Sequence, residues 1–491
     1  MRSFFKQFVA SLIIAVGLYF AFTHLGTIQN ILQINPSNNA QVNLNDRVYL
    51  ENKNSICSIN KVGAKFDFFQ FKNYGTNAIN FLIPEHAKNE FFTYLEFHGD
   101  QAPKINDNWQ ADKNQLKWHG DIWHIEQIFD LEGYDLIRTV KIKNISQQAH
   151  KIGITNTIKR NISDKAEKEL FISNTNFIER VPYKAQTMRK NHTGWIGMND
   201  KYFAVANKAQ NVDVNLYEDK VGTTYVNLVM GEQNIEAGQE ILCSFKTYVG
   251  PKDTALLDSR GDGLNKVVSY GFWGFIVRPM SRIFKGLHYY IGSVGIVLIL
   301  FTLIIKAITL PLSLSAQRSM QQMRDIQPAI AALKKQHSGS PQVLQLRMLE
   351  LYKQHKLNPL SMFFQMIVQL LLFFPIYRLF TSLIDFKGAP FFGIVQDLSM
   401  PDPSSWTNLF GLAPWAPVSY LPNFGILPLI MALTFLFQPF DQNNKQMRYI
   451  FPIIMLFVGN SMPAAVVIYW IITNILTLIQ NKIVTGKAVM A

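Results

Sequence analysis

Long apolar runs dominate the second half of the chain, whereas short alternating stretches dominate the first half. The apolar runs lie at about 291–312, 360–384, 421–438 and 449–480. A helix needs roughly 20 residues to cross a bilayer, so each of the first three runs predicts one transmembrane helix. The last run is too long for one span and is interrupted by "GNSMP". It therefore predicts two short helices that meet near Asn460–Pro463.

The N-terminus, "MRSFFKQFVASLIIAVGLYFAF", places Arg2 and Lys6 before an apolar run. This pattern is typical of a signal peptide or of an uncleaved membrane anchor. Threonine and histidine follow the run and are poor cleavage residues, which favours an anchor. With that anchor the sequence predicts six transmembrane helices, one at 1–23 and five within residues 289–485, near 289–312, 360–384, 421–438, 449–461 and 463–481.

Residues 24–268 alternate between apolar and polar positions, as in "YDLIRTVKIKN" and "TTYVNLVMG". Alternation with period two, rich in β-branched and aromatic residues, predicts a large antiparallel β-sandwich. About 245 residues are enough for one such domain with its own core. The two cysteines of the chain, Cys57 and Cys243, both lie here, and the sequence leaves open whether they pair.

Residues 269–288 predict an amphipathic helix lying in the membrane interface, because Arg278, Arg282 and Lys285 recur at helical spacing among apolar residues. Pro279 is expected to break or kink this helix. A linker packed on the β domain is the alternative interpretation of the same stretch.

Charge predicts the topology. Seven Lys or Arg and two acids lie between Ser313 and Leu360, but one Lys and two acids lie between Phe386 and Tyr420. By the positive-inside rule, the first loop is cytoplasmic and the second is external. The N-terminus is then cytoplasmic, and residues 24–288 are exported.

The cytoplasmic loop, residues 314–358, is expected to form an antiparallel helical hairpin, because apolar residues recur every three or four positions on both sides of "HSGSP". Its basic face either is simply solvated or contacts ribosomal RNA or anionic lipid headgroups. The basic residues of this hairpin are Arg318, Arg324, Lys334, Lys335, Arg347, Lys353 and Lys356.

Lys306 is a charge within the apolar run "LFTLIIKAITLPL". Ionisable residues within spans are costly and usually face water, a partner or a substrate. Thr302, Lys306, Thr309 and Ser313 share one face of a helix, so the charge belongs to a polar stripe. Snorkelling of the lysine to the cytoplasmic surface is the simpler alternative.

Other predicted spans carry similar polar stripes. Gln365 and Gln369 are one helical turn apart, and the last span carries Tyr469, Thr473, Asn474, Thr477 and Gln480. Polar sides of several spans are compatible with lipid only when they converge on a shared interior. The sequence therefore predicts a hydrated groove among the helices.

Composition is consistent with a membrane protein: 48% of residues are hydrophobic, mean hydropathy is +0.06 and the formal net charge is +13. The sequence contains no phosphate-binding loop, no H-E-x-x-H motif and no Cys pair motif. No catalytic residue, cofactor or metal is expected, and the chain is not predicted to be an enzyme.

Several stretches resemble the YidC family of membrane protein insertases, in its Gram-negative form: "YGFWGFIVRPMSRIFKGLHYYIGSVGI", "KAITLPLSLSAQRSMQQMRDIQPAIAALKKQH", "LELYKQHKLNPL" and "MPAAVVIYWIITNILTLIQ". The resemblance implies an α+β membrane protein: a five-helix insertase core with an N-terminal anchor, a cytoplasmic hairpin, and a periplasmic β-supersandwich of the sugar-mutarotase type.

The resemblance also implies a hydrophilic groove with one cationic residue, which maps on Lys306, and substrate contacts at Thr302 and Trp470. Family members often have arginine and tyrosine where this chain has Lys306 and Trp470, and a proline common soon after the position of Gln369 is missing. Implied partners are nascent membrane proteins, membrane lipids, the Sec translocon and possible ribosome contacts, without a small-molecule substrate.

Two other classes of function remain open on the sequence alone. A transporter or channel would use Lys306 as an intramembrane anion site and would admit water from both sides. An exported carbohydrate-binding or carbohydrate-modifying protein would need clustered acids and aromatics, for which "GDIWHIEQ" (Asp121, Trp123, His124 and Glu126) is the one dense candidate.

Overall fold

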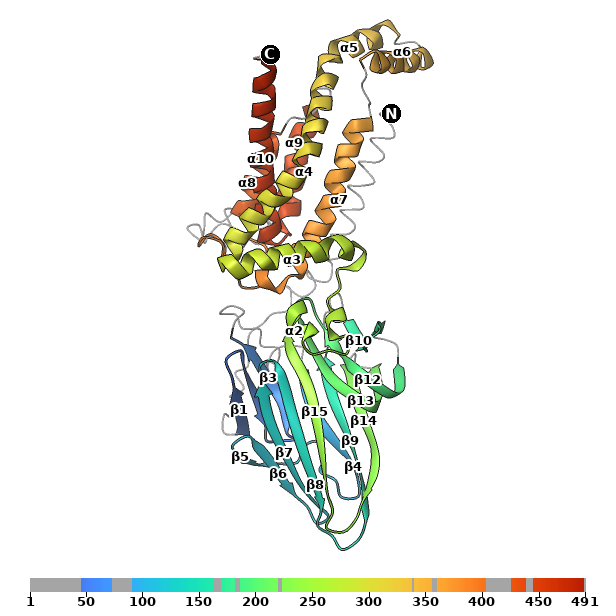
Figure 1. Cartoon of the computed structure of the whole chain (residues 1–491), viewed down its shortest axis with the longest axis vertical. Helices are drawn as coiled ribbons and strands as arrows, with labels where there is room; N and C mark the ends of the chain where they lie inside the picture. The colour runs from blue at the N-terminus through green and yellow to red at the C-terminus, as the bar shows by residue number, and fades with distance from the viewer. Residues whose placement is uncertain are drawn as a thin grey trace, which may run out of the picture. The chain divides into compact units, whose positions relative to one another are not determined.

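The computed structural model describes residues 46–72, 91–161, 169–181, 186–219, 223–337, 340–355, 360–402, 425–438 and 445–489. They form two compact units that divide after Val268. Strands make up most of the first unit and helices make up the second (Figure 1). The anchor predicted for residues 1–23 lies outside the described residues.

The first unit contains fifteen antiparallel strands within the described residues. Their bounds are β1 Arg47–Glu51, β2 Ser55–Asn60, β3 Lys65–Phe71, β4 Phe91–Gly99, β5 Gln110–Asp112, β6 Gln115–His119, β7 Trp123–Glu132, β8 Asp135–Asn144, β9 His150–Asn161, β10 Glu169–Ser173, β11 Ile178–Val181, β12 Thr187–Asn199, β13 Phe203–Glu218, β14 Thr223–Ile235 and β15 Glu240–Pro251.

Hydrogen bonds join these strands in the order β1-β2-β3-β4-β9-β14-β13-β15-β8-β7-β6-β5, with β10, β11 and β12 branching from β13. Strand β13 connects the two halves of this sheet. Its residues 203–207 pair with β15, whereas its residues 213–218 pair with β14. One long strand therefore belongs to both halves of the sheet.

Aromatic contacts fold the two halves onto each other around a buried core. Phe66 of β3 meets Phe129 of β7 edge to face, and Phe71 of β3 stacks on Phe203 of β13. Such rings bury large apolar areas and dominate the energy of a core. The period-two pattern is visible in β7, whose alternate residues from Trp123 to Phe129 are buried. The predicted antiparallel β-rich domain is therefore present.

The second unit begins with η3 (Gly271–Trp273) and is built from helices (Figure 1). Their bounds are α3 Gly274–Ile291, α4 Val294–Asp325, α5 Gln327–Gln336, α6 Pro341–Gln354, α7 Leu360–Ser382, η4 Ile384–Phe386, α8 Ile426–Leu436, α9 Lys445–Asn460 and α10 Ala464–Val489. Two further short helices, α2 (Thr254–Asp258) and η2 (Leu264–Val267), close the first unit.

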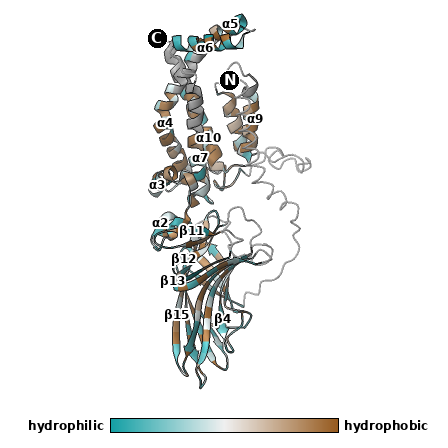
Figure 2. Ribbon diagram, turned by 90° about the vertical axis from the view of Figure 1, so that its right-hand side faces the viewer, coloured by the Kyte–Doolittle hydropathy of each residue, from teal (hydrophilic) through white to brown (hydrophobic). Residues whose placement is uncertain are grey.

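Within the described residues, one helical segment, Val294–Ser315 in α4, is long and apolar enough to cross a membrane by length and composition. The other apolar helical segments are shorter: Leu371–Ser382, Ile426–Leu436, Tyr449–Asn460 and Ala464–Gln480. Figure 2 shows that α4 and α9 are coloured mainly hydrophobic, whereas α5 and α6 are mixed. The count of six spans stays a prediction.

Two details of the helical unit concern prolines. The helix α9 ends at Asn460 and α10 begins at Ala464, so the interruption lies at the "GNSMP" stretch. The helix α3 runs through Pro279 without a break, so of the predicted break or kink the break is wrong and the kink stays a prediction. Proline removes the hydrogen bond to the carbonyl four residues earlier, here that of Phe275.

The helices α5 and α6 pack on each other around a small apolar cluster. Ile326 and Ile330 are buried, and Met348, Leu351 and Tyr352 pack against them. Helix α4 continues through residues 314–325 without a break, so the segment predicted to begin the hairpin is an extension of α4.

The two cysteines lie on different strands, Cys57 in β2 and Cys243 in β15. Both are buried, and they are not disulfide-bonded. Burial raises the pKa of the Cys243 thiol, which keeps it in its unreactive protonated form at neutral pH.

Candidate functional site

Lys306 lies in the middle of α4 and reaches across to α10. Its side chain is half-buried, and its Nζ donates a hydrogen bond to Thr477 Oγ1 over 2.7 Å. The Thr477 hydroxyl in turn donates to the carbonyl of Thr473, also over 2.7 Å. The ammonium is therefore held by a hydroxyl that is itself oriented by its own helix.

No carboxylate of the described residues lies within ion-pair distance of the Lys306 ammonium. A hydroxyl can satisfy one of the three donors of an ammonium but does not neutralise its charge. An unneutralised cation on an apolar helix attracts anionic groups strongly, since local screening is weak there. This arrangement suits a site that binds an anion transiently.

The other hydroxyls of the α4 stripe point back into their own helix. Thr302 is fully buried and donates to the carbonyl of Leu298, and Thr309 donates to the carbonyl of Ile305. Ser313 likewise donates to the carbonyl of Thr309. This back-bonding is common for Thr and Ser in transmembrane helices. The stripe is thus continuous on one face, while Lys306 alone extends from it to another helix.

Three predicted residues of α10 lie within eight positions of Thr477, the partner of Lys306, and have different surroundings. Trp470 stacks on Phe373 of α7 with ring centroids 5.0 Å apart, and it meets Phe435 of α8 edge to face. Tyr469 is buried and meets Phe380 of α7 edge to face. The Thr473 hydroxyl, one turn from Thr477, is buried and has no hydrogen-bond partner among the described residues.

A second polar link joins α10 to Thr434 in α8 and to Gln438 just after that helix, and neither residue was predicted from the sequence. Asn474 Nδ2 donates to Thr434 Oγ1 over 2.8 Å, and Gln438 Nε2 donates to the carbonyl of Asn474 over 3.4 Å. Thr434 and Gln438 are four residues apart in an otherwise apolar run, so the same spacing argument that found Gln365 and Gln369 applies to them.

Gln365 and Gln369 lie in α7, but their side chains are outside what the structure describes. The basic residues of the predicted hairpin are distributed over three helices: Arg318 and Arg324 in the extension of α4, Lys334 and Lys335 in α5, and Arg347 and Lys353 in α6. The last four are exposed, the side chains of the first two are not described, and Lys356 lies outside the described residues.

The amphipathic helix α3 is tied to the segment after α7 by a charged contact. His288 Nδ1 and Asp385 Oδ1 are 2.9 Å apart. The hydrogen bond with Asp385 raises the pKa of His288. Burial alone would raise the pKa of Asp385, but the hydrogen bond from His288 and the charge of Lys285 outweigh it and lower that pKa. In α3 the exposed aromatic residues include Phe275, Tyr289 and Tyr290, and Phe272, just before the helix, is exposed as well.

Two family models match this chain and together span most of it. The model described as the YidC periplasmic domain matches residues 47–283, and the model described as the 60Kd inner membrane protein matches residues 286–490. The boundary between the two matches falls within α3 and near the division between the two units.

Curated relatives agree with these matches. A protein of Agrobacterium fabrum named membrane protein insertase YidC is 27% identical, over 90% of this chain and 82% of its own. One of Rickettsia rickettsii with the same name is 26% identical, over 89% of this chain and 86% of its own. One of Rickettsia felis is 31% identical over 61% of this chain and 56% of its own. The shared name denotes a function that is not enzymatic.

Solved structures give weaker likenesses. A crystal structure of an active YidC insertase with its first transmembrane domain resolved has a TM-score of 0.40 and 14% identity, over 89% of this chain and 93% of that one. A galactose mutarotase-like protein of Lactobacillus casei has a TM-score of 0.32 and 8% identity, over 42% of this chain and 100% of that one. On the two family models and the curated relatives, this chain belongs to the YidC family of membrane protein insertases.

Proposed function

We propose that this chain inserts nascent membrane proteins into the inner membrane and helps them to fold, through a hydrophilic groove in which Lys306 is the cationic residue. The observation that carries this proposal is the Lys306 ammonium. It lies on the helical segment that is long and apolar enough to cross a membrane, bonds to a hydroxyl and meets no carboxylate of the described residues. The groove would include Thr302, Thr309, Gln365, Gln369, Tyr469, Trp470 and Thr473.

The physical task of an insertase is to move a short polar tail across about 30 Å of hydrocarbon. Each charged residue in that tail costs several kcal/mol at the centre of the bilayer. A polar groove that reaches partway into the membrane shortens the dry distance. The tail then leaves the groove on the far side while its apolar helix moves sideways into lipid.

Lys306 gives this groove a preference for acidic tails. Its attraction for a carboxylate is strong where screening is weak, yet the lysine is only half-buried, so the bound tail can leave again. Thr477 holds the ammonium toward α10 in the absence of a client. In this proposal a client carboxylate takes over the contact that Thr477 makes in the resting protein.

The proposal includes a topology and partners. Both ends of the chain and the α5–α6 hairpin are cytoplasmic, and the β-rich unit is periplasmic, as the distribution of Lys and Arg indicates. The exposed basic residues of α5 and α6 would recruit a ribosome or a client. The chain would act alone or together with the Sec translocon.

A charge reversal tests the role of Lys306. The variant Lys306→Glu, reconstituted in liposomes, is expected to lose at least tenfold in the insertion of a single-span client with an acidic tail, measured by protease protection. Lys306→Arg retains the charge and is expected to keep most of the activity. Lys143→Glu is the matched control, since Lys143 is an exposed residue of β8 and the change in net charge is the same.

A client with an uncharged tail separates attraction from general damage. Lys306→Glu should insert this client nearly as well as the unchanged protein does. Normal insertion of the acidic client by Lys306→Glu, or an equal loss for both clients, would show that the cation does not act by attracting the tail.

The recruiting role of the hairpin has its own test. Deletion of residues 318–357 is expected to abolish crosslinking of the chain to ribosomes carrying a nascent membrane protein. Undiminished crosslinking after the deletion would refute that role without affecting the role of Lys306.

A further inference from the structure

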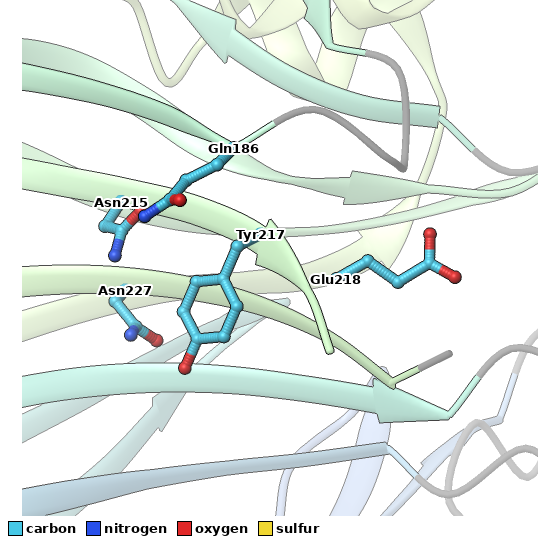
Figure 3. Close-up of a pocket in the computed structure, with 5 residues that line it drawn as sticks. All are labelled: Gln186, Asn215, Tyr217, Glu218 and Asn227. Atoms are coloured by element: carbon cyan, nitrogen blue, oxygen red, sulfur yellow. The ribbon is translucent and has the colours of Figure 1, made fainter. Parts of the chain in front are cut away.

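A pocket on the β-rich unit is not used by the function proposed above. It has a volume of about 450 Å³ and is lined by Gln186, Asn215, Tyr217, Glu218 and Asn227. Figure 3 shows the three amide side chains on one side of the Tyr217 ring and the Glu218 carboxylate on the other. The lining therefore combines amides, one aromatic ring and one acid.

Strand register explains why these side chains gather. Asn215 of β13 lies opposite Asn227 of β14, Asn227 opposite Thr157 of β9, and Thr157 opposite Tyr94 of β4. Residues directly opposite in a ladder project from the same face of a sheet. Two residues further along the same face, Tyr217 lies opposite Tyr225. We call Asn215, Asn227, Thr157, Tyr217 and Tyr225 the polar shelf.

The shelf is turned away from the apolar core. Leu216, Val226 and Ile158, which alternate with the shelf residues along β13, β14 and β9, are all fully buried. The polar row lies on the face of the sheet opposite to the core, so core packing does not require it. In an ordinary surface such a row would be satisfied by solvent or by neighbouring side chains.

Three polar atoms of the shelf are covered but unsatisfied. Asn215 Oδ1, Asn227 Oδ1 and Thr157 Oγ1 are buried and have no hydrogen-bond partner among the described residues. Thr157 as a whole is 1% exposed. Each buried polar group without a partner costs about 1–3 kcal/mol. Two of the three atoms are amide oxygens, which can only accept, so a ligand that donates hydrogen bonds would relieve this cost.

The shelf also offers aromatic surface. Tyr217 and Tyr225 stack with ring centroids 4.9 Å apart and an angle of 12° between the rings. Stacked rings make a rigid platform of low conformational entropy. The apolar C–H face of a sugar ring packs on such a platform, while the hydroxyl groups at its edge reach amide and carboxylate oxygens.

Other ligand classes fit the shelf less well. Glu218 is the one charged residue among the five that line the pocket, which disfavours phosphate and other anions there. One basic group, the Lys159 ammonium, lies over the Tyr225 ring, 5.7 Å from its centroid, at the edge of the shelf. An extended peptide usually binds by adding a strand to a free sheet edge. At the pocket, β13 is already paired with both β12 and β14, so no edge is open there.

From these observations we infer that the polar shelf is a binding site for a neutral saccharide. A sugar ring lies against the tyrosine pair, its hydroxyl groups donate to Asn215 Oδ1 and Asn227 Oδ1, and Glu218 accepts from a hydroxyl at the rim. This inference is independent of the proposed insertase function, because it involves none of the residues of the helical groove.

The test measures saccharide binding by the full-length chain. The protein is purified in dodecyl dimethylamine oxide, since maltoside detergents carry a sugar headgroup that would compete for the site. Maltotriose and the N-acetylated sugar chitotriose are then titrated separately, with saturation-transfer NMR as the readout. At least one of them is expected to bind with a Kd below about 1 mM, and dodecyl maltoside is expected to compete with maltotriose if that sugar is bound.

Matched variants locate the site. Asn227→Ala and Tyr217→Ala are each expected to weaken binding at least tenfold. Tyr217→Phe keeps the ring and is expected to weaken binding less than threefold. Asn234→Ala is the control, since Asn234 lies on the same strand β14 but is exposed outside the pocket, and this variant should bind like the unchanged protein.

Two outcomes overturn the inference. One is that neither sugar binds at 10 mM while circular dichroism shows the β-rich unit folded. The other is that a sugar binds equally well to Tyr217→Ala and to Asn227→Ala. Saturable binding of an octapeptide of alternating glycine and asparagine, without sugar binding, would assign the pocket to peptides instead. Normal client insertion in all four variants would leave the insertase proposal standing in either case.

Discussion

The ammonium of Lys306 and the hydroxyl of Thr477 are 2.7 Å apart, although 171 positions of sequence separate the two residues. The bond connects the centre of α4 to the centre of α10. It gives a cation on an apolar helix a defined direction without cancelling its charge. A site that must capture and release acidic segments needs both of these properties.

Replacement of Thr477 tests this relationship. In Thr477→Val the ammonium loses its hydroxyl partner while the shape of the side chain is kept. We expect insertion of an acidic-tailed client into liposomes to fall three- to tenfold, because Lys306 is no longer held in one direction. Thr477→Ser retains the hydroxyl and should insert normally. An unchanged rate in Thr477→Val would mean that the bond has no role in insertion.

The link between Asn474 and Thr434 is expected to stabilise the packing of α8 on α10. Hydrogen bonds between membrane helices contribute on average about 0.6 kcal/mol, and at most about 1.7 kcal/mol. The coupling energy from a double-mutant cycle of Asn474→Ala and Thr434→Ala, measured by unfolding in detergent, should fall in this range. A coupling near zero would show that each residue finds another partner when the first is removed.

The contact between His288 and Asp385 predicts a pH dependence. The pKa of His288 is raised, so its contribution to stability is complete below its ordinary value of about 6.5 and is lost as the pH rises through the raised value. The pKa of Asp385 is lowered, so its contribution is present above about 3.9 and is lost only as the pH falls through the lowered value. Both groups are charged between about pH 4 and pH 6.5.

The variant His288→Asn keeps a neutral donor at this place and removes the titration. Its thermal stability in detergent should differ from that of the unchanged protein most at about pH 5.5, and the difference should shrink as the pH rises through the raised pKa of His288. Since the His288 side chain is 29% exposed, solvent screening limits the difference to about 1 kcal/mol. A difference that grows toward pH 9 would have the wrong sign for this contact.

Arg138 is the most unusual charge of the β-rich unit. Its side chain lies over the rings of Phe66 and Phe129, Nη2 donates to the carbonyl of Thr93 over 3.3 Å, and Nη1 has no partner among the described residues. Burial lowers the pKa of Arg138 to about 9, so the group is still charged at neutral pH.

A buried charge without a counterion costs free energy that an apolar side chain of similar volume does not. Arg138→Met should therefore raise the free energy of unfolding by about 1 kcal/mol, whereas Arg138→Ala should lower it by about 3 kcal/mol because it leaves a cavity. Urea unfolding of the intact chain, followed by hydrogen exchange in β8, measures both. Destabilisation by Arg138→Met would show that the cation contacts with the two rings outweigh the cost of burial.

Periodicity predicted the large features of this chain. The alternation in "YDLIRTVKIKN" gave strand β8, and the "GNSMP" interruption corresponds to the gap between α9 and α10. These features depend on residues that are neighbours in sequence. At Pro279 the sequence predicted a break or a kink, and α3 continues without a break. Whether a proline ends a helix depends on the surroundings of that helix, which the local sequence does not reveal.

The partners of the candidate site were not predictable in the same way. The polar stripe of α4 suggested that Thr302 and Thr309 accompany Lys306, but both hydroxyls bond to carbonyls of their own helix. The hydroxyl that does reach Lys306 is that of Thr477 in α10. Whether Thr477 or Thr473 faces the lysine depends on the rotation of α10 about its axis relative to α4. Such a rotation is set by packing across the whole interface, which no stripe on one helix reveals.

The position of β13 in the sheet also determines when the β-rich unit can close. Residues 47–161 contain two separate ladders, β1 to β4 with β9, and β5 to β8, and no strand pairing in the described sheet joins them. Among the named strands they are joined through β14, β13 and β15, which end at Pro251, and one isolated bridge pairs Val62 with Asn108. A chain still emerging from its site of synthesis therefore carries two open strand edges, on β9 and β8, until residues 203–251 are made. During that interval the protein is itself a client in need of protection from aggregation.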